Sequence, residues 1–593
     1  MKKILILLAL LVSTASLMAE PIGEKRARQI AEDFFSQYAS RATTDELSLE
    51  WAGNDIGAAT RGSSNNDALM YIYNRGTDDG FVVVAGDSNI APIIAYSFNT
   101  TLDTSDMAEA TRAILDAWCK QVAAARLSTQ PVSEGIPNIA TRSSDYLLYD
   151  TAIWNQHEPY NWEAPVYNGY RSVTGCVATA MSIICYYNQW PSKGTGTTPA
   201  YSYTDPYGYT RSVAANTLGR TYQYSSMLKD YNNGYNTTQG NAVAALMKDM
   251  GTSVQMMYHY TGSSAYDSNA IMAFTTYFRY SKSAKYAYRS SYPIAEWNEL
   301  IRENLDSYGP TYYCGQSNSG GHAFVVDGYN GDYLHFNFGW GGSGNGFFLC
   351  PNIEYYAGQM ALLGLKPDKN GSSTYTDNLV LYPYDDNQSY NNNYRGITTA
   401  ATSFNENVRF NVLIGTFYNI GPVVFDGNIR LMLTDRSGKI KQELTTLFTQ
   451  SITPGSLTWD CDYYATITTT IEEGDRLRVY YKGKYSNDWQ WMRSMDYETC
   501  YDEIVLRPTA EEIAQNLKLK YNKNTKTITY SLPYAHDFAM TNATNNTSIS
   551  TKSYAPRSVV TIDVSEMVDN DVTDSLDLSF TIKEENYTVR IKL

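Results

Sequence analysis

Cys176 is the residue of this 593-residue chain whose surroundings best suit covalent chemistry. It opens an apolar run that continues to Tyr187 and is typical of a buried helix, which places the thiol at the first turn. The positive end of a helix dipole and the unpaired N–H groups there favour the thiolate, the form of cysteine that acts as a nucleophile. The alternative is a structural cysteine packed beneath the helix. Cys185, farther along the same run in apolar surroundings, fits that alternative.

A histidine able to serve as the base for this thiol is His322, which lies in a strand-like run entered through Gly320 and Gly321. Glycines allow backbone and substrate to come close to an imidazole. Asn337 follows soon after and could hydrogen-bond to the far nitrogen of His322, while Trp340 could shield it. An ordinary turn residue is the alternative for Asn337, and core packing is the alternative for Trp340.

Composition and spacing exclude several other classes of function. The formal net charge is −15 and no cluster of Lys and Arg stands out, so the chain lacks the basic surface that binds nucleic acid. Its seven cysteines are spread without the regular spacing of a disulfide framework. Cysteines and histidines form no CxxC or HxxxH pair of the kind that binds zinc. We therefore expect no nucleic-acid partner, no metal and no other cofactor.

The first 19 residues have the pattern of a secretory signal peptide: a charged start, an apolar run over 4–12 and small residues up to Ala19. A membrane anchor is the alternative, but this apolar run is too short to cross roughly 30 Å of hydrocarbon as a helix. No later stretch reaches the required length. We expect an exported protein, secreted or at the cell surface, without a membrane span.

The region before residue 145 contains predicted helices and strands that could cover the candidate catalytic residues. The spacing of apolar residues predicts amphipathic helices over 26–38 and 107–122, with strands over 69–73 and 81–84 between them. Residues 128–144 have the composition of a linker. Residues 20–144 are therefore predicted to form an α+β domain with its linker.

The rest of the chain is predicted to form three further domains. Residues 145–367, which hold all the chemical residues above, alternate helical and strand patterns and read as one α+β domain. Beyond 368 helical periodicity ends, and short alternating runs separated by Gly, Asn and Asp predict two β-sandwich modules, 368–507 and 508–593. Nothing in their sequence shows whether they bind carbohydrate, protein or a cell surface.

Four ordered blocks resemble the streptopain family of papain-like cysteine peptidases. They are 154–161 (WNQHEPYN), 175–180 (GCVATA) with 190–191 (WP), 321–328 (GHAFVVDG) and 337–342 (NFGWGG). His322 lies 146 positions after Cys176, within the roughly 130 to 150 residues that separate nucleophile and histidine in papain-type enzymes. The resemblance implies a papain-like catalytic domain over 145–367. It also implies that the preceding region, with 80–87 (GFVVVAGD), is an inhibitory propeptide.

The resemblance assigns a role to each chemical residue. Cys176 is the nucleophile, His322 accepts and donates the proton, and the side chain of Gln156 donates to the oxyanion. Asn337 orients the imidazole. The family usually has NWGW where this chain has Asn337-Phe338-Gly339-Trp340, and we expect tryptophan at position 338 to be tolerated.

The activity expected from these residues is hydrolysis of peptide bonds by a cysteine endopeptidase made as a zymogen. Its partners would be protein and peptide substrates and its own propeptide as an intramolecular inhibitor. The resemblance implies a preference for a hydrophobic residue two positions before the cut. A catalytically inactive surface adhesin on a peptidase scaffold is the main alternative, although loss of activity usually removes the nucleophile or the histidine. A transglutaminase or amidase on a papain-like fold would lack the four blocks.

Overall fold

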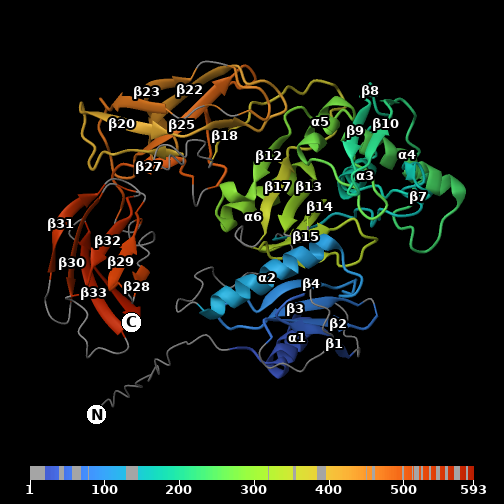
Figure 1. Ribbon diagram of the computed structural model, residues 1–593, viewed down its shortest axis with the longest axis horizontal. Coiled ribbons are helices and arrows are strands. Elements are labelled where there is room, and N and C mark those ends of the chain that lie inside the picture. The colour runs from blue at the N-terminus through green and yellow to red at the C-terminus, as the bar shows by residue number, and fades with distance from the viewer. Residues whose placement is uncertain are drawn as a thin grey trace, which may run out of the picture. The chain divides into compact units, whose positions relative to one another are not determined.

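The computed structural model divides the chain into two units (Figure 1). Unit 1 comprises residues 1–289 and 294–372, and unit 2 comprises 290–293 and 373–593. The predicted signal peptide and the predicted linker 128–144 lie outside the described residues. The structure describes residues 21–38, 46–56, 68–77, 79–127, 145–317, 320–351, 356–382, 396–448, 451–456, 458, 461–496, 500–509, 512, 520–522, 525–532, 534, 536–542, 548–554, 558–565, 575–582 and 585–592.

The N-terminal part of unit 1, residues 21–127, contains both predicted helices. Helix α1 (Glu24–Tyr38) buries Ala27, Ala31, Phe34 and Phe35, which confirms the predicted amphipathic face. Helix α2 (Glu109–Leu127) covers the second predicted helix. Between them lie the strands β1 (Leu47–Gly53), β2 (Met70–Arg75), β3 (Phe81–Ala85) and β4 (Ile93–Ser97), of which β2, β3 and β4 are buried along their whole length.

The central part of unit 1, from residue 145 to 372, combines helices with a sheet. Its helices are α3 (Cys176–Asn188), α4 (Thr237–Ser253), α5 (Ser268–Thr276) and α6 (Ile294–Tyr308). Its main strands are β5 (Tyr146–Leu148), β12 (Lys285–Tyr288), β13 (Thr311–Ser317), β14 (Gly320–Asn330), β15 (Tyr333–Asn337), β16 (Gly346–Phe348) and β17 (Ala357–Leu363). Short hairpins are formed by β6 (Val166–Tyr167) with β7 (Tyr170–Arg171), β8 (Thr197–Thr198) with β11 (Asn216–Thr217), and β9 (Tyr201–Thr204) with β10 (Thr210–Val213).

One antiparallel sheet runs through both parts of unit 1. Its order is β1-β2-β3-β4-β16-β15-β14-β13-β17-β12, and β5 pairs with β14. The junction is the pairing of β4 with β16, where Tyr96 faces Phe347 and Ala95 faces Phe348. Helix α2 lies against β13 and β14 of the central part (Figure 1). The N-terminal part is therefore built into the same sheet that carries His322.

Helix α3 is buried because its sequence is apolar on all sides. Residues 177–185 are all buried in it, and they share one core with Leu246 of α4, Phe274 of α5 and Val325 of β14. A helix that is hydrophobic all round must lie inside a domain. Burial of α3 between the other helices and the sheet fixes the position of its first residue, Cys176.

Unit 2 is built from strands throughout the part that the structure describes. They are β18 (Leu379–Leu381), β19 (Ile397–Thr398), β20 (Arg409–Ile414), β21 (Phe417–Asn419), β22 (Gly427–Thr434), β23 (Ile440–Phe448), β24 (Cys461–Thr466), β25 (Arg476–Gly483), β26 (Gln490–Trp491), β27 (Glu503–Val505), β28 (Lys520–Asn522), β29 (Thr527–Tyr530), β30 (His536–Asn542), β31 (Ser548–Tyr554), β32 (Val560–Asp563), β33 (Ser575–Ile582) and β34 (Glu585–Lys592). The sheets β19-β20-β24 and β23-β22-β25-β26 share one core that includes Val412, Leu431 and Val479. Two sheets thus pack around one core here, and the β-sandwich modules over 368–507 and 508–593 stay predictions.

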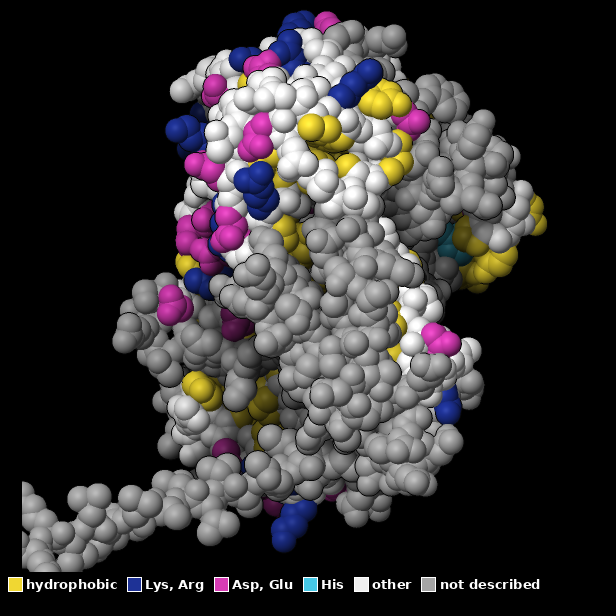
Figure 2. Space-filling view, turned by 90° about the vertical axis from the view of Figure 1, so that its left-hand side faces the viewer, with side chains coloured by type: hydrophobic (Ala, Val, Ile, Leu, Met, Phe, Trp, Pro, Cys, Tyr) yellow, Lys and Arg dark blue, Asp and Glu magenta, His cyan; other side chains and the backbone are white. Residues whose placement is uncertain are grey.

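The surface of this first β module carries both signs of charge. Lys441 of β23 is 2.9 Å from Glu472, and Arg430 of β22 pairs with Glu443 of β23. Over the module in Figure 2, basic and acidic side chains are interspersed. The face in that view therefore presents no large area of one charge.

Candidate active site

The first turn of α3 presents Cys176. Gly175 precedes the helix with φ of 86°, and a Cβ at Gly175 would lie 2.6 Å from the sulfur of Met256. Glycine is required there both by the left-handed backbone and by this close approach. Cys176 is half-buried, whereas Cys185 is fully buried in the core. The predicted place of Cys176 at the helix start and the predicted packing of Cys185 are both confirmed.

His322 lies near the start of β14 with a fixed hydrogen-bond partner. Its Nε2 atom is 3.0 Å from the carbonyl oxygen of Phe338. Because a carbonyl can only accept a hydrogen bond, Nε2 carries the proton of the neutral ring. The nitrogen left to take up a proton is therefore Nδ1.

Cys176 and His322 come together through the backbone of β14. Helix α3, which begins at Cys176, packs against β14, which carries His322 near its start. On its other side, β14 pairs with β13, where Gly315 faces His322. A thiol and an imidazole, carried by a helix and by a strand that share one core, are thus neighbours.

Burial controls the charge of both groups in this structure. Burial raises the pKa of the Cys176 thiol to about 11, although hydrogen bonds to the backbone of Ala323 and Val177 act to lower it. Burial also lowers the pKa of His322, against the opposing effects of the Phe338 carbonyl and of Glu109. Both shifts favour the uncharged forms of the two groups. Desolvation of the thiol thus acts against the thiolate that the helix dipole favours.

Helix α2 brings the N-terminal part up to this pair. A Cβ built on Gly320, two residues before His322, would lie 2.9 Å from a carboxylate oxygen of Glu109. A Cβ on Gly344 would lie 3.2 Å from the hydroxyl of Thr111. The first turn of α2 therefore lies directly over the start of β14, at the entrance to the Cys–His pair.

Gln156 and Trp340 are placed differently with respect to the pair. The backbone oxygen of Gln156 accepts a hydrogen bond of 3.1 Å from the N–H of Thr174, which holds the buried Gln156 close to the start of α3. The half-buried ring of Trp340 meets His157 edge to face, with 6.2 Å between ring centroids. Gln156 thus lies near the nucleophile, and the described ring partner of Trp340 is His157.

Asn337 does not make the hydrogen bond expected of it. Its Nδ2 atom donates to the hydroxyl of Thr151 and to the carbonyl oxygen of Ala152, both at 2.9 Å, and its Oδ1 atom accepts from the N–H of Gly339 at 3.2 Å. The carbonyl of the next residue, Phe338, takes the place at His322 instead. The carbonyl of Phe338 can take this place because the backbone turns directly after it, at Gly339, which has a φ of 68°.

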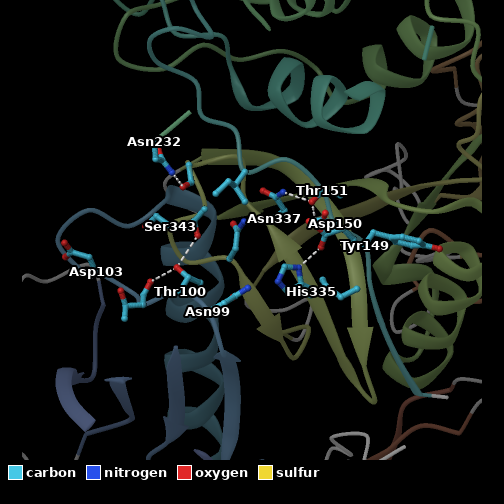
Figure 3. A pocket seen from close by; sticks show the side chains of 17 residues that line it. Asn99, Thr100, Asp103, Tyr149, Asp150, Thr151, Asn232, His335, Asn337 and Ser343 are labelled. Carbon is cyan, nitrogen blue, oxygen red and sulfur yellow. Dashed lines mark hydrogen bonds and ion pairs between the residues drawn. The ribbon is translucent and has the colours of Figure 1, made fainter. Parts of the chain in front are cut away.

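A polar pocket of about 560 Å³ opens beside Asn337 (Figure 3). Segment 99–103 of the N-terminal part lines one side, and Thr151, Asp327 and His335 of the central part line another. Sequence reasoning missed Thr151 and Asp327. The signal for Asp327 was available, since it is the one charged residue in the otherwise apolar run 323–329. Thr151 gave no comparable signal.

Phe338 packs in the core, so the expectation that tryptophan is tolerated there stays a prediction, and this packing argues against it. Its ring is fully buried and packs against Phe324, Phe336 and Phe348, with centroids 5.2, 5.9 and 5.5 Å away. We predict that Phe338→Trp lowers the free energy of unfolding by about 1–3 kcal/mol, because the larger ring overpacks this cluster. Urea unfolding checks this value, with Phe338→Leu as a variant that tests loss of volume instead. An unchanged midpoint for the tryptophan variant would show that the cluster adapts.

No group of three His, Cys, Asp or Glu side chains within the described ranges is arranged to hold a metal ion. A helix-borne thiol beside a strand-borne histidine is the arrangement of the cysteine peptidases, and this is the class of protein to which the fold and the site point.

Comparisons with known proteins narrow the class. Residues 154–348 match the model of the peptidase C10 family, and residues 19–122 match the model described as Spi protease inhibitor. Streptopain from Streptococcus pyogenes is 30% identical over 402 residues, which cover 61% of this chain and 98% of streptopain. The chain therefore belongs to the peptidase C10 family, whose members here include streptopain.

Two further relatives extend the comparison. The thiol protease/hemagglutinin PrtT of Porphyromonas gingivalis is 31% identical over 396 residues, which cover 62% of this chain but only 45% of PrtT. Among solved structures, a fragment of prointerpain A from Prevotella intermedia is 27% identical, with a TM-score of 0.45, and the match covers 55% of this chain and 99% of that fragment. Within this chain, the residues that match the protease inhibitor model precede those that match the peptidase C10 family.

Proposed function

We propose that the chain is an exported cysteine endopeptidase made as a zymogen, with Cys176 as nucleophile and His322 as its acid and base. The observation that carries the proposal is the packing of α3, which begins at Cys176, against β14, where the Nδ1 atom of His322 is left to accept the thiol proton. Export rests on the signal-like pattern of residues 1–19. No helix among the described residues has the length and apolar character of a membrane span.

The reaction would be acyl transfer in two steps. The Cys176 thiolate attacks the peptide carbonyl, and His322 gives its proton to the leaving amine, so that a thioester remains on the enzyme. Water then attacks the thioester while His322 takes up a proton from it. The backbone N–H of Cys176 and the side-chain amide of Gln156 would bind the oxyanion, and loss of one such donor costs about 100- to 1,000-fold in turnover.

Residues 20–144 would keep the enzyme inactive until they are removed. Three contacts support this role: β4 extends the sheet at β16, the indole N–H of Trp118 donates to the carbonyl of Leu349 at 3.1 Å, and the hydroxyl of Tyr333 donates to the carbonyl of Ile93 at 2.8 Å. The turn that carries Glu109 lies at the entrance to the site. A neutral thiol beneath this cover cannot act as a nucleophile.

Cleavage between Ser128 and Tyr149 is expected to release activity. With a pKa of about 11, only about one thiol in 10,000 is ionised at pH 7, so restoring the thiolate leaves room for a gain of at least about 100-fold. The measurement is the rate at which a thiol-directed epoxide labels Cys176, read by mass spectrometry, together with hydrolysis of a fluorogenic peptide. If the enzyme matures itself, unmodified precursor shortens with time, whereas precursor carrying Cys176→Ala stays intact. Equal labelling and hydrolysis before and after cleavage would refute the inhibitory role.

A further inference from the structure

A buried chain of polar contacts lies behind Asn337 and ends at the catalytic histidine. Asp327 contacts His335 and Thr151, Thr151 contacts Asn337, and the peptide after Asn337 contacts His322. All five side chains are less than one-tenth exposed. The reaction steps proposed above use only His322 of these five residues, and Asp327, Thr151 and His335 have no role in them.

A β-bulge places Asp327 in the chain of contacts. The pairing of β14 with β15 shifts register between Val326 and Gly328, so Asp327 is an extra residue on its strand. Bulges re-aim side chains and occur next to active sites. One carboxylate oxygen of Asp327 is 2.5 Å from Nδ1 of His335, and the other accepts the hydroxyl hydrogen of Thr151.

The direction of the hydrogen bonds is set by the carboxylate. The Thr151 hydroxyl has one hydrogen, which it gives to Asp327, so its lone pairs can only accept. Asn337 therefore presents Nδ2 to Thr151 and keeps Oδ1 for the N–H of Gly339. Because both faces of the carboxamide are used, Asn337 cannot flip without leaving a buried group unpaired.

This orientation holds the peptide that binds His322. The N–H of Phe338 donates to Oδ1 of Asn345 at 3.0 Å, and the carbonyl of Phe338 accepts from Nε2 of His322. The Phe338 carbonyl is thus held between Asn337 on one side and the Gly339 turn on the other. Its position decides both the tautomer and the orientation of the imidazole.

We propose that Asp327 and Thr151 are positioning residues, which act through Asn337 to hold the Phe338 carbonyl against His322. This inference rests on the proposed function. It predicts that the hydroxyl of Thr151 matters for catalysis although it touches neither Cys176 nor substrate.

The test compares Thr151→Val with Thr151→Ser. Each variant is produced as the full-length precursor and measured after activation. Valine keeps the volume and removes the hydroxyl, so turnover per active site, counted by epoxide labelling, is expected to fall roughly 10- to 100-fold with KM changed less than about threefold. Serine restores the hydroxyl and is expected to recover turnover to within about threefold of the parent. Asp327→Asn keeps the shape of the side chain but removes an acceptor. Its turnover is expected to lie between those of Thr151→Val and Thr151→Ser.

The matched control is Thr252→Val in α4. The hydroxyl of the buried Thr252 accepts from Nδ2 of Asn216 at 3.0 Å, as Thr151 accepts from Asn337, but it lies on a helix that carries none of the residues assigned to the reaction. Thr252→Val is expected to lower the melting temperature and leave turnover per labelled site unchanged. If Thr151→Val behaves in the same way, the chain of contacts serves only folding and the inference is overturned. A parent protein that neither hydrolyses peptides nor labels at Cys176 would instead overturn the proposed function.

Discussion

We expect peptide hydrolysis to disappear when Cys176 is replaced by alanine, because Cys176 is the thiol at the helix start assigned to form the thioester. The variant should fold as the parent does, since Cys176 is only half-buried and alanine is tolerated at the first turn of a helix. Hydrolysis of a fluorogenic peptide and the melting temperature, measured on the same preparation, check both halves of this prediction.

Cys185→Ala is the matched control for the nucleophile. Cys185 lies on the same helix, is fully buried, and has the pKa of its thiol raised by burial to about 12, so it supplies no thiolate at neutral pH. The variant is expected to lose some stability, because it leaves a small cavity, and to keep its turnover. Comparable loss of activity in both variants would show that the nucleophile is assigned wrongly.

Replacing His322 by alanine is expected to lower turnover by about 1,000- to 10,000-fold in correctly folded protein. The loss combines two effects: no group accepts the proton of Cys176, and no group protonates the leaving amine. Steady-state turnover, corrected for folded protein by circular dichroism, measures the effect. Addition of free imidazole is a further check, because a small base can enter the space left by the ring.

His259→Ala controls for the loss of a buried imidazole. His259 is as buried as His322, at 7% exposure each, and its Nδ1 atom is 2.7 Å from the hydroxyl of Thr261. We expect a lower melting temperature and turnover within about threefold of the parent. If His259→Ala lowered turnover as much as His322→Ala, the assignment of the base would be wrong.

Local pattern was sufficient to predict the elements that carry the nucleophile. The apolar run after Cys176 predicted a buried helix, and the structure has α3 there with Cys176 as its first residue. The three-to-four spacing of Ile30, Ala31 and Phe34 predicted α1 in the same way. Such predictions succeed because helical periodicity is written within a few consecutive residues.

Features that depend on pairing between distant segments were not predictable from such patterns. The bulge at Asp327 exists only relative to β15, and the junction of β4 with β16 joins strands that are far apart in the chain. Asn337 shows the consequence at the site. The position of Asn337 after His322 suggested a hydrogen bond between the two side chains. The backbone turn at Gly339 instead brings the carbonyl of Phe338 to His322. The raised pKa of Cys176 was also not predictable from the sequence, because it depends on how deeply the start of the helix is buried in the folded protein.

The pairing of β4 with β16 has a consequence for the solution behaviour of an activated enzyme. If the N-terminal part is removed, β16 becomes the edge of its sheet, and the ring of Phe347 loses Tyr96, on which it stacks with centroids 5.2 Å apart. Exposed edge strands with apolar side chains promote self-association. The edge is only three residues long, which limits how well it can recruit a second strand. Aggregation should therefore rise with concentration after activation, and added N-terminal domain should reverse it by covering the same edge.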